Sequence, residues 1–367
     1  MSSDASRGTE RHCPAVKLST TPAPLEQFIA EVIEPQHDQL RDGGKRYSHG
    51  QLLYRAARRC RLHVKKIGHT HRALFHSGAA VGGINEGVTS LVSHQAHRIC
   101  RSTVMIRRYL NTAEVPTPES KVLQQNQYAT AVKYWEWLGR RATVKPSRAS
   151  GSGAAEVAGT TVGVRFEGDL RAAWKKAAES VEPDHPILIE AAQNGLDVHT
   201  YVVGETVVGA LVRVPFYVLG DGESSIDELA HAELARRMGP QDEVPELSDD
   251  ALTEVGLTRS YVPASGSICE LPPVLGAPRD GSLYVDVTDE LSEEVKQLAI
   301  DGLWALPGLE AAAVDLVVPA LDSTEGAMVM DIDPAANVAD FRYPDYGKYR
   351  KPHLAIMEQI VRRSPAH

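Results

Sequence analysis

Three aspartates near the C-terminal end of the chain have the spacing of a cation site. Asp331 and Asp333 stand two residues apart, so in a strand their side chains point to the same face. Asp315 lies in the preceding strand candidate. Clustered buried carboxylates repel one another unless a cation is present, and oxygen ligands favour Mg²⁺ or Mn²⁺. Three acids on a solvated strand face are the alternative, and both interpretations stay open at this point.

A lysine followed by a loop of small residues suggests a phosphate site. Lys145 ends a predicted strand, and the segment Gly151-Ser-Gly-Ala-Ala-Glu156 follows it. This segment nearly matches the dinucleotide fingerprint, but a strand pattern comes next where that fingerprint requires a helix. A small-residue loop between antiparallel strands can instead fold over phosphates through its backbone N–H groups. Taken alone, each feature favours the simpler interpretation, a plain flexible hairpin loop and an exposed lysine at a strand end.

The composition bounds the class of protein. The chain has 367 residues and a formal net charge of -9, which argues against a general nucleic-acid or membrane-surface binder. Four cysteines without a CxxC pair favour a reducing cytoplasm. No apolar run of about 18 residues predicts a transmembrane helix, and the N-terminus lacks the apolar core of a secretory signal.

The N-terminal third is basic and rich in histidine. The stretch from Gln51 to Arg61 predicts a helix whose apolar residues face inward. Its arginines could form an anion site or a solvated helix face, and the pattern alone favours the solvated face. His94 and His97 could share a helix face, but no third ligand for zinc is evident.

The remaining pattern mixes strands and helices, with hairpins rather than regular βαβ units, which predicts an α+β fold. Strands are expected at 141–146, 160–166, 187–190, 313–318 and 327–332, and a hairpin at 200–218 turns at Gly204-Glu205. Helices are expected at 94–110, 169–181, from the capping box at Ser225 to Met238, from Thr288 to Leu306, and at 352–363.

From about His94 onward the chain resembles the ATP-grasp superfamily, in particular the branch of cyanophycin synthetases, glutathione synthetases and D-alanine–D-alanine ligases. The matching segments occur in family order at Val115–Pro118, Val144–Pro146, Ser150–Gly153, Ile187–Glu190 with Gly195–Asp197, Gly220–Gly222 with Ser225–Leu229, Asp286–Asp289, and Val314–Asp315 with Val329–Pro334. The resemblance implies that ATP is held between two α+β lobes. The expected parts are a disordered tail at 1–24, an N-terminal substrate domain at 25–115, a central lobe with the phosphate loop at 116–205 and a C-terminal lobe with the metal site at 206–367.

The resemblance also implies roles for individual residues. Lys145 would hold the α- and β-phosphates, and the loop of Ser150, Gly151, Ser152 and Gly153 would close over the transferred phosphate. Glu190 and the backbone towards Gln193 would contact adenine, and Asp197 would bind the ribose. Two magnesium ions, or manganese, would be bound by Asp315, Asp331 and Asp333. Arg213 would contact phosphate or the acceptor, and Arg279 would hold an anionic substrate.

The sequence departs from the family pattern at several of these positions. An early lysine that supplements the phosphate site is missing, and Arg101 or Arg107 could replace it. Ala191 and His199 stand where relatives carry basic residues, His199 in place of an arginine. Asp331 and Asp333 stand where Glu and Asn are usual.

The expected activity is that of an ATP-dependent carboxylate–amine ligase, which forms an amide or peptide bond through an acyl phosphate. Its partners would be a small-molecule carboxylate and an amine, such as amino acids or small peptides, with no nucleic acid and no membrane. A homodimer is the family habit. Two alternatives stay open, namely a non-catalytic nucleotide-binding regulatory protein on the same fold and a small-molecule kinase.

Overall fold

A computed structural model describes residues 23–41, 46–139, 141–147, 159–183, 185–238 and 242–364. Most of the predicted tail and the predicted phosphate loop, Ser150 to Gly153, lie outside these residues. Pro24, which we expected in the tail, is the first residue of helix α1 (Pro24–Phe28). None of the described helices is both long and apolar enough to cross a bilayer.

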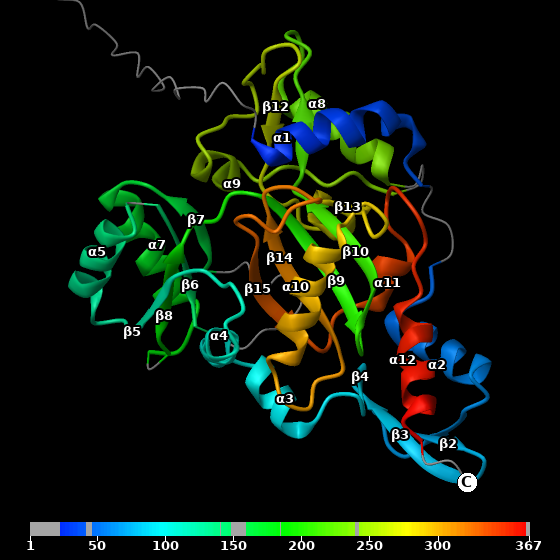
Figure 1. Cartoon of the computed structure of the whole chain (residues 1–367). Coiled ribbons are helices and arrows are strands. Elements are labelled where there is room, and N and C mark those ends of the chain that lie inside the picture. The colour runs from blue at the N-terminus through cyan, green and yellow to red at the C-terminus, as the bar shows by residue number, and fades with distance from the viewer. Residues whose placement is uncertain are drawn as a thin grey trace, which may run out of the picture.

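An antiparallel five-stranded sheet forms the centre of the molecule (Figure 1), with strand order β13-β10-β9-β14-β15. Its strands are β9 (Leu196–Val203), β10 (Thr206–Val214), β13 (Leu283–Asp286), β14 (Ala311–Val318) and β15 (Met328–Asp333). Helix α10 (Glu293–Trp304) covers one face, where its apolar side meets the valines and leucines of the strands. The opposite face carries the polar residues discussed below.

A second antiparallel sheet, of order β5-β8-β6-β7, lies beside the first (Figure 1). It consists of β5 (Ser120–Leu123), β6 (Ala142–Pro146), β7 (Thr161–Val164) and β8 (Ile187–Ala191). Helices α5 (Tyr128–Trp137) and α7 (Glu167–Glu179) pack on one of its faces through an apolar core that includes Trp135 and Trp174.

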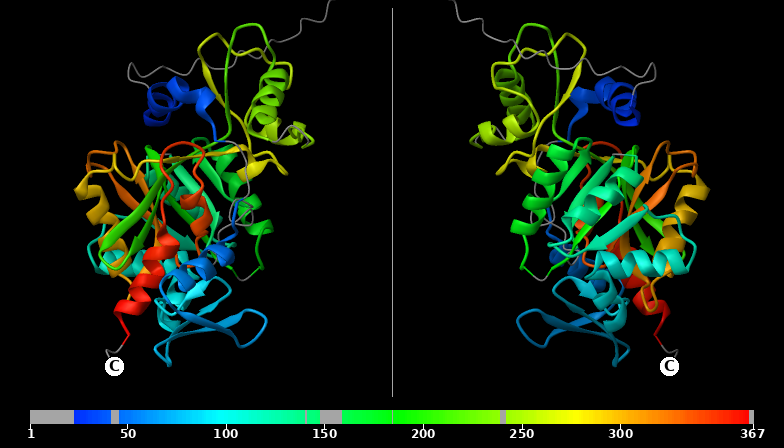
Figure 2. Two further views of the ribbon diagram at one scale, coloured as in Figure 1. Left: turned by 90° about the vertical axis from the view of Figure 1, so that its right-hand side faces the viewer. Right: turned by 90° about the vertical axis from the view of Figure 1, so that its left-hand side faces the viewer.

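Two smaller parts flank the central sheet at opposite ends (Figure 2). At one end, α1 lies near β11 (Tyr217–Leu219), α8 (Ile226–Arg237), α9 (Asp249–Glu254) and β12 (Ile268–Glu270). At the other end are α2 (His49–Arg59), β1 (His63–Lys66), β2 (His71–His76), β3 (Ala79–Asn85) and β4 (Val88–Thr89), together with α11 (Val338–Arg342) and α12 (Pro352–Arg362). Helix α2 packs on α11 and α12. The N-terminal segment expected as one substrate domain therefore contributes to both ends.

Three expected boundaries are wrong. The helix expected at 94–110 is two helices, α3 (His94–Cys100) and α4 (Thr103–Thr112), because the Ser102 side chain caps α4 by accepting from the Met105 N–H. The helix expected from Thr288 begins at Glu293, because the Thr288 hydroxyl is engaged by Asp286 and by the Ala210 N–H. Strand β9, expected in the central lobe, pairs with β10 and β14 and so belongs to the five-stranded sheet.

Most of the other expected elements agree with the structure, but the hairpin expected to reach Val218 ends at Val214, because Tyr217–Leu219 is a separate strand, β11, that pairs with β12. The mixture of helices and antiparallel sheets confirms the α+β class. The hairpin of β9 and β10 turns at Gly204 and Glu205, and the capping box at Ser225 is present at the start of α8. These elements have the strongest local signals, since a two-residue turn and a reciprocal cap are each specified by a few adjacent residues.

Candidate active site

The first charged cluster lies on the second sheet, on the face away from its helices. Alternate residues of β6 and β8 pack against α5 and α7, which directs Lys145 and Glu190 to the opposite face. Glu190 is 1% exposed, and its carboxylate accepts from Lys145 Nζ at 2.7 Å and from Arg107 Nη2 at 3.1 Å. We call these three residues the lysine cluster.

Arg107 joins this cluster to the five-stranded sheet. It projects from α4 and donates from Nη1 to the Val329 carbonyl of β15 at 2.7 Å, and also to the Thr117 hydroxyl. Its buried Nε–H has no acceptor among the described residues. Of the two candidates for the missing lysine, the structure places Arg107 in the cluster, whereas Arg101 is exposed.

Opposing effects act on the Glu190 carboxyl. Its burial would raise its pKa, but the positive charges of Lys145 and Arg107 and their hydrogen bonds outweigh burial and hold the pKa below its ordinary value. Glu190 is therefore ionised at neutral pH and holds the two cations in place. The carboxylate is engaged by side chains, so any contact with adenine would come from the backbone of this strand.

The second charged cluster lies on the five-stranded sheet, on the face opposite α10. Val198 and Val212 pack towards α10, so their strand neighbours Asp197, His199 and Arg213 point the other way. Arg213 binds Asp197 in a fork, with Nε and Nη2 at 2.9 and 2.8 Å from the two oxygens. We call Asp197, His199, Arg213 and Asp315 the aspartate cluster.

Asp315 is held from two sides in this cluster. Arg213 Nη2 lies 3.1 Å from Asp315 Oδ2, and His199 Nδ1 hydrogen-bonds the other oxygen, Oδ1. Burial would raise the pKa of Asp315, but the charges of Arg213 and His199 outweigh it, so the pKa is lowered. The His199 ring stacks on Phe341 of α11 at 5.0 Å, which fixes its orientation.

A glycine makes room for that stacking. Gly209 lies beside a register shift in β10, and a Cβ added there would come within 2.9 Å of Phe341 Cδ1. Any side chain at this position would push Phe341 away from the ring of His199. The sheet backbone and α11 thus determine how the histidine meets Asp315.

Asp331 stands between the two clusters. It is the cross-strand partner of Asp315 in the β14–β15 pair, and Asp333 is the partner of Ala313 on the same face. Burial and the charge of Asp315 raise the pKa of Asp331, while Lys145 and Arg107 act in the opposite direction. The negative charge of Asp315 and the positive charges of Lys145 and Arg107 therefore act on the same carboxyl group, that of Asp331.

Asp315, Asp331 and Asp333 offer the carboxylate oxygens that Mg²⁺ and Mn²⁺ prefer. They do not form a closed ligand shell in this structure. Among the described residues, no three side chains of His, Cys, Asp or Glu are grouped closely enough to hold a metal ion. Asp315 is turned towards Arg213 and His199, and Asp333 Oδ1 accepts from the Ala335 N–H at 2.8 Å. The electrostatic conflict between Asp315 and Asp331 is nevertheless one that a bound cation would relieve.

Arg279 and Gln193 lie at the edge of this arrangement. Arg279 donates to the Tyr343 carbonyl at 2.8 Å and pairs with Asp345, and its guanidinium lies 4.2 Å from the Tyr284 ring centroid. Tyr284 is the cross-strand partner of Arg213. Gln193 donates to the Ala191 carbonyl just after β8. The loop from Ser150 to Gly153 lies outside the described residues.

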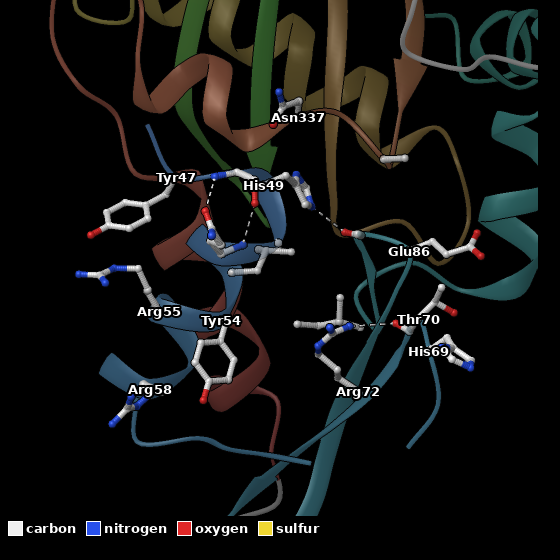
Figure 3. A pocket seen from close by; sticks show the side chains of 17 residues that line it. Tyr47, His49, Tyr54, Arg55, Arg58, His69, Thr70, Arg72, Glu86 and Asn337 are labelled. Atoms are coloured by element: carbon white, nitrogen blue, oxygen red, sulfur yellow. Dashed lines mark hydrogen bonds between the residues drawn. The ribbon is translucent and has the colours of Figure 1, made fainter. Parts of the chain in front are cut away.

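A large cavity opens near Asp333, whose carboxylate accepts from the N–H of the lining residue Ala335. It has a volume of about 930 Å³ and lies between α2 and the β2–β3 hairpin. Figure 3 shows Arg55 and Arg58 on the α2 side and Arg72 and Glu86 on the hairpin side. Ala335 and Asn337, which follow Asp333 closely in the chain, complete the lining. We call this the α2 cavity.

A histidine fixes the two walls of the α2 cavity. His49 Nδ1 accepts from the Val338 N–H at 3.2 Å, and its Nε2 lies 3.1 Å from the Gly87 carbonyl. This histidine therefore joins α2 to the β3–β4 turn and to the start of α11. Burial lowers the pKa of His49, so the neutral tautomer with the proton on Nε2 fits both contacts.

Several residues of the site could not be recognised from the sequence. Tyr284 is the cross-strand partner of Arg213, and Phe341 stacks on the ring of His199. Both come from segments far away in sequence from the residues they meet. The alternation of Tyr284 and Asp286 in β13 is a weak signal that both face the site. Phe341 carries no such signal, because only the tertiary packing of α11 brings it under His199.

Comparisons with known proteins agree with the motif order. No protein-family model matches the chain. The bifunctional glutathione biosynthesis protein of Mannheimia succiniciproducens is 26% identical over 293 residues, which are 75% of this chain and 37% of that protein. Cyanophycin synthetase of Trichormus variabilis is 26% identical over 271 residues, covering 69% of this chain and 28% of that protein. The chain thus spans well under half the length of these curated relatives.

Among solved structures, a bifunctional glutathione synthetase from Pasteurella multocida superimposes with a TM-score of 0.57 at 21% identity. The match covers 86% of this chain and 44% of that chain. The resemblance predicted from the motifs is confirmed: the chain is similar in sequence to glutathione and cyanophycin synthetases, and it has the α+β ATP-grasp fold.

Proposed function

We propose that the chain is an ATP-dependent carboxylate–amine ligase that forms an amide bond through an acyl phosphate. One observation carries the proposal: the cations Lys145 and Arg107 meet at Glu190 of one sheet, and Arg107 also contacts β15 of the other sheet, where Asp331 pairs with Asp315 across the strands. Arg107 reinforces this arrangement, because it contacts Glu190 on one side and the β15 backbone on the other. Similarity to glutathione and cyanophycin synthetases supports the same reaction class.

Lys145 and Arg107 would neutralise the charge of the ATP phosphates. Both cations are held by Glu190 in this structure, so they are prepositioned and need not be ordered when ATP binds. The single ionised carboxylate of Glu190 is shared between two cations, which leaves net positive charge for a phosphate. The Nε–H of Arg107, which has no acceptor among the described residues, is a further donor.

Asp315, Asp331 and Asp333 are the residues that would hold Mg²⁺ or Mn²⁺. When bound, the cations offset the charge on the transferred phosphoryl group. Arg213 orients Asp197 and Asp315 through its fork, and His199 holds the second oxygen of Asp315. Asp197 would present its remaining acceptor sites to the ribose hydroxyls.

In the reaction, an oxygen of the substrate carboxylate attacks the γ-phosphorus of ATP and the bond to ADP breaks. The amine nitrogen then attacks the acyl carbon, phosphate leaves, and the amine loses a proton. The α2 cavity adjoins the aspartates through Ala335, and we place the substrate there. Arg279 is held by Asp345 and Tyr343, so we assign it to positioning Tyr284 beside Arg213.

We also propose a reducing compartment such as the cytoplasm, because the cysteines that the structure describes are free thiols. Cys60, Cys100 and Cys269, which are the cysteines in the described residues, form no disulfide. Burial raises the pKa of Cys100 to about 12, so this thiol stays protonated and acts as a small apolar residue of the core.

A coupled assay of ADP release tests the proposed function. Pools of amino acids and dipeptides are supplied with Mg²⁺ and ATP, and the products are examined by mass spectrometry. We expect ADP release that requires both an amine and a carboxylate, with a product lighter than its two substrates by one water. A phosphorylated product without amine dependence would identify a kinase, and ATP binding without any ADP release would identify a regulatory protein; either result contradicts the proposal.

A further inference from the structure

A second cavity, of about 390 Å³, lies on the outer side of α2. Helix α2 forms one wall, and the chain from the end of α11 to the start of α12 forms the other. Its lining residues are Arg55, Ala56, Arg58, Arg59, Arg342, Lys351, His353 and Leu354. We call this the basic pocket, because every ionisable residue in its lining is a potential cation.

Among the residues that the structure describes, the cations of the basic pocket have no acidic partners. Within the part of the chain that the structure describes, none of its arginines, nor Lys351, takes part in an ion pair. This is unusual for a chain of net charge -9, in which acidic side chains outnumber basic ones. Arg55, Arg58 and Arg59 also share one helix face, where like charges repel.

The far wall adds more positive potential. Helix α12 begins at Pro352 and its N-cap residue, Lys351, makes no side-chain cap, so the positive end of the helix dipole faces a lysine rather than an acid. His353 has a buried Nδ1 without a partner among the described residues. Arg342 is supported by the rings of Tyr343 and Tyr349, at 5.7 and 4.9 Å from the centroids. Among the described residues, no acidic side chain pairs with Arg342 or Lys351 on this wall.

The basic pocket adjoins the α2 cavity at two shared residues. Arg55 and Arg58 line both of them. Figure 3 shows these two side chains along α2 at the side of the α2 cavity. A solvated helix face, which the sequence alone favours for these arginines, does not account for the convergence of Arg342 and Lys351 on them from the C-terminal end of the chain.

We propose that the basic pocket binds a second anionic group of the substrate whose reacting end lies in the α2 cavity. The substrate is then an elongated molecule with at least two anionic groups, carboxylates or phosphates, such as a short acidic peptide. This inference rests on the proposed function for the identity of the α2 cavity as the substrate site. The binding of a polyanion to the basic pocket itself does not depend on catalysis.

Calorimetric titrations without nucleotide test the inference. Triglutamate supplies carboxylates, tripolyphosphate supplies phosphates and triglutamine is the neutral control. The double variant Arg342→Gln/Lys351→Gln removes two cations that line the basic pocket and not the α2 cavity. Lys175→Gln, on the exposed side of α7, is a control that removes one cation far from the pocket in sequence. Because tripolyphosphate resembles the phosphate chain of ATP, only the part of its binding that the double variant loses is assigned to the basic pocket.

We expect saturable binding of triglutamate or tripolyphosphate but not of triglutamine. The double variant should bind about 100-fold more weakly, roughly tenfold for each cation removed, and Lys175→Gln should bind like the wild type. Whichever polyanion shows this weakening identifies the anionic group. If the double variant fails to fold, Arg59→Gln provides a single change in the same pocket, with affinity expected to fall by about tenfold.

Two results would overturn the inference: no polyanion binds to the wild-type protein, or the double variant binds as tightly as the wild type. Its failure is distinguishable from failure of the proposed function. Ligation of neutral substrates with no triglutamate or tripolyphosphate binding would contradict this inference alone. Polyanion binding in the basic pocket with no ADP release under any condition would contradict the ligase proposal and leave the pocket assignment in place.

Discussion

The molecule uses its cations in two different ways. In the lysine and aspartate clusters, Lys145, Arg107 and Arg213 each contact a carboxylate. In the basic pocket, Arg58, Arg342 and their neighbours contact none among the described residues. Paired cations hold two parts of the fold in register and offer an anion only their residual charge. Unpaired cations leave the potential of the surface available to a ligand. We therefore expect substitutions of the paired cations in the first region to affect stability and catalysis, and substitutions of the arginines and Lys351 in the second to affect binding alone.

The largest effect is expected at Asp331. Replacing it with asparagine, Asp331→Asn, should lower the rate of ADP formation by about 1,000-fold, because several kcal/mol of charge stabilisation depends on this carboxylate. Steady-state assays of the variant with its true substrates measure the decrease. Asp322→Asn, at an exposed position in the turn between β14 and β15, is the control and should be fully active. Full activity in Asp331→Asn would show that the metal assignment is wrong.

A large stability effect is expected at Glu190. Glu190→Gln leaves Lys145 and the buried Arg107 without their carboxylate, so the free energy of unfolding should fall by about 3 kcal/mol. Urea denaturation measures this change. By contrast, Arg58→Gln in the basic pocket should change stability by less than about 0.5 kcal/mol, since it breaks no ion pair. Equal decreases in the two variants would remove the distinction between the regions.

The fork of Arg213 should matter for catalysis more than its charge does. Arg213→Lys keeps the positive charge, but a lysine cannot hold Asp197 in two places while contacting Asp315. We expect kcat/KM for ATP to fall by about tenfold, equivalent to roughly 1.4 kcal/mol. Arg259→Lys makes the same exchange in a network near α8 and α9 and should leave kcat/KM unchanged. A wild-type value in Arg213→Lys would mean that charge alone suffices.

The smallest effect concerns pH. Burial, with the charges of Arg342 and Lys351, lowers the pKa of His353 to about 4, below the ordinary value of 6.5. Arg55, Arg58 and Arg59 face the same pocket from α2. The unfolded chain therefore takes up a proton at this residue before the folded one does, and stability is lost as pH falls from about 6.5 towards 4.

Thermal unfolding measured across this range should show the His353 contribution as the difference between wild type and His353→Gln, of the order of 1 kcal/mol. Saturating triglutamate should reduce that difference, because a bound anion favours the protonated imidazole. Identical pH profiles for the two proteins, with and without the peptide, would mean that His353 does not sense the cations of the basic pocket.

The sequence predicts the parts of the site that local periodicity determines. Asp331 and Asp333 share a face because strand residues alternate, and Lys145 ends its strand at a proline. The β9–β10 hairpin is specified by its Gly-Glu turn. The placement of Arg107 between Glu190 and Val329 could not be predicted in the same way, because it depends on the packing of α4 against two sheets.

The basic pocket shows the limit of sequence analysis more clearly. The arginines of α2 have the pattern of a solvated face, and nothing within that segment indicates what lies opposite. Arg342 and Lys351 are separated from α2 by nearly the whole chain, and only the packing of α2 on α11 and α12 brings them together. Likewise, the helix expected from Thr288 starts later, because the tertiary partners of that hydroxyl outweigh its local capping signal.

The proposed chemistry depends on one nucleotide being held between the two sheets, with the lysine cluster on one side and the aspartates on the other. A crystal structure with Mg²⁺ and a non-hydrolysable ATP analogue would show whether the nucleotide is bound between these two sheets. We expect phosphates between Lys145 and Asp331, with cations bound by Asp315, Asp331 and Asp333 and the adenine beside the strand of Glu190. A nucleotide bound elsewhere, or phosphates that contact neither Lys145 nor any cation on these aspartates, would contradict this arrangement.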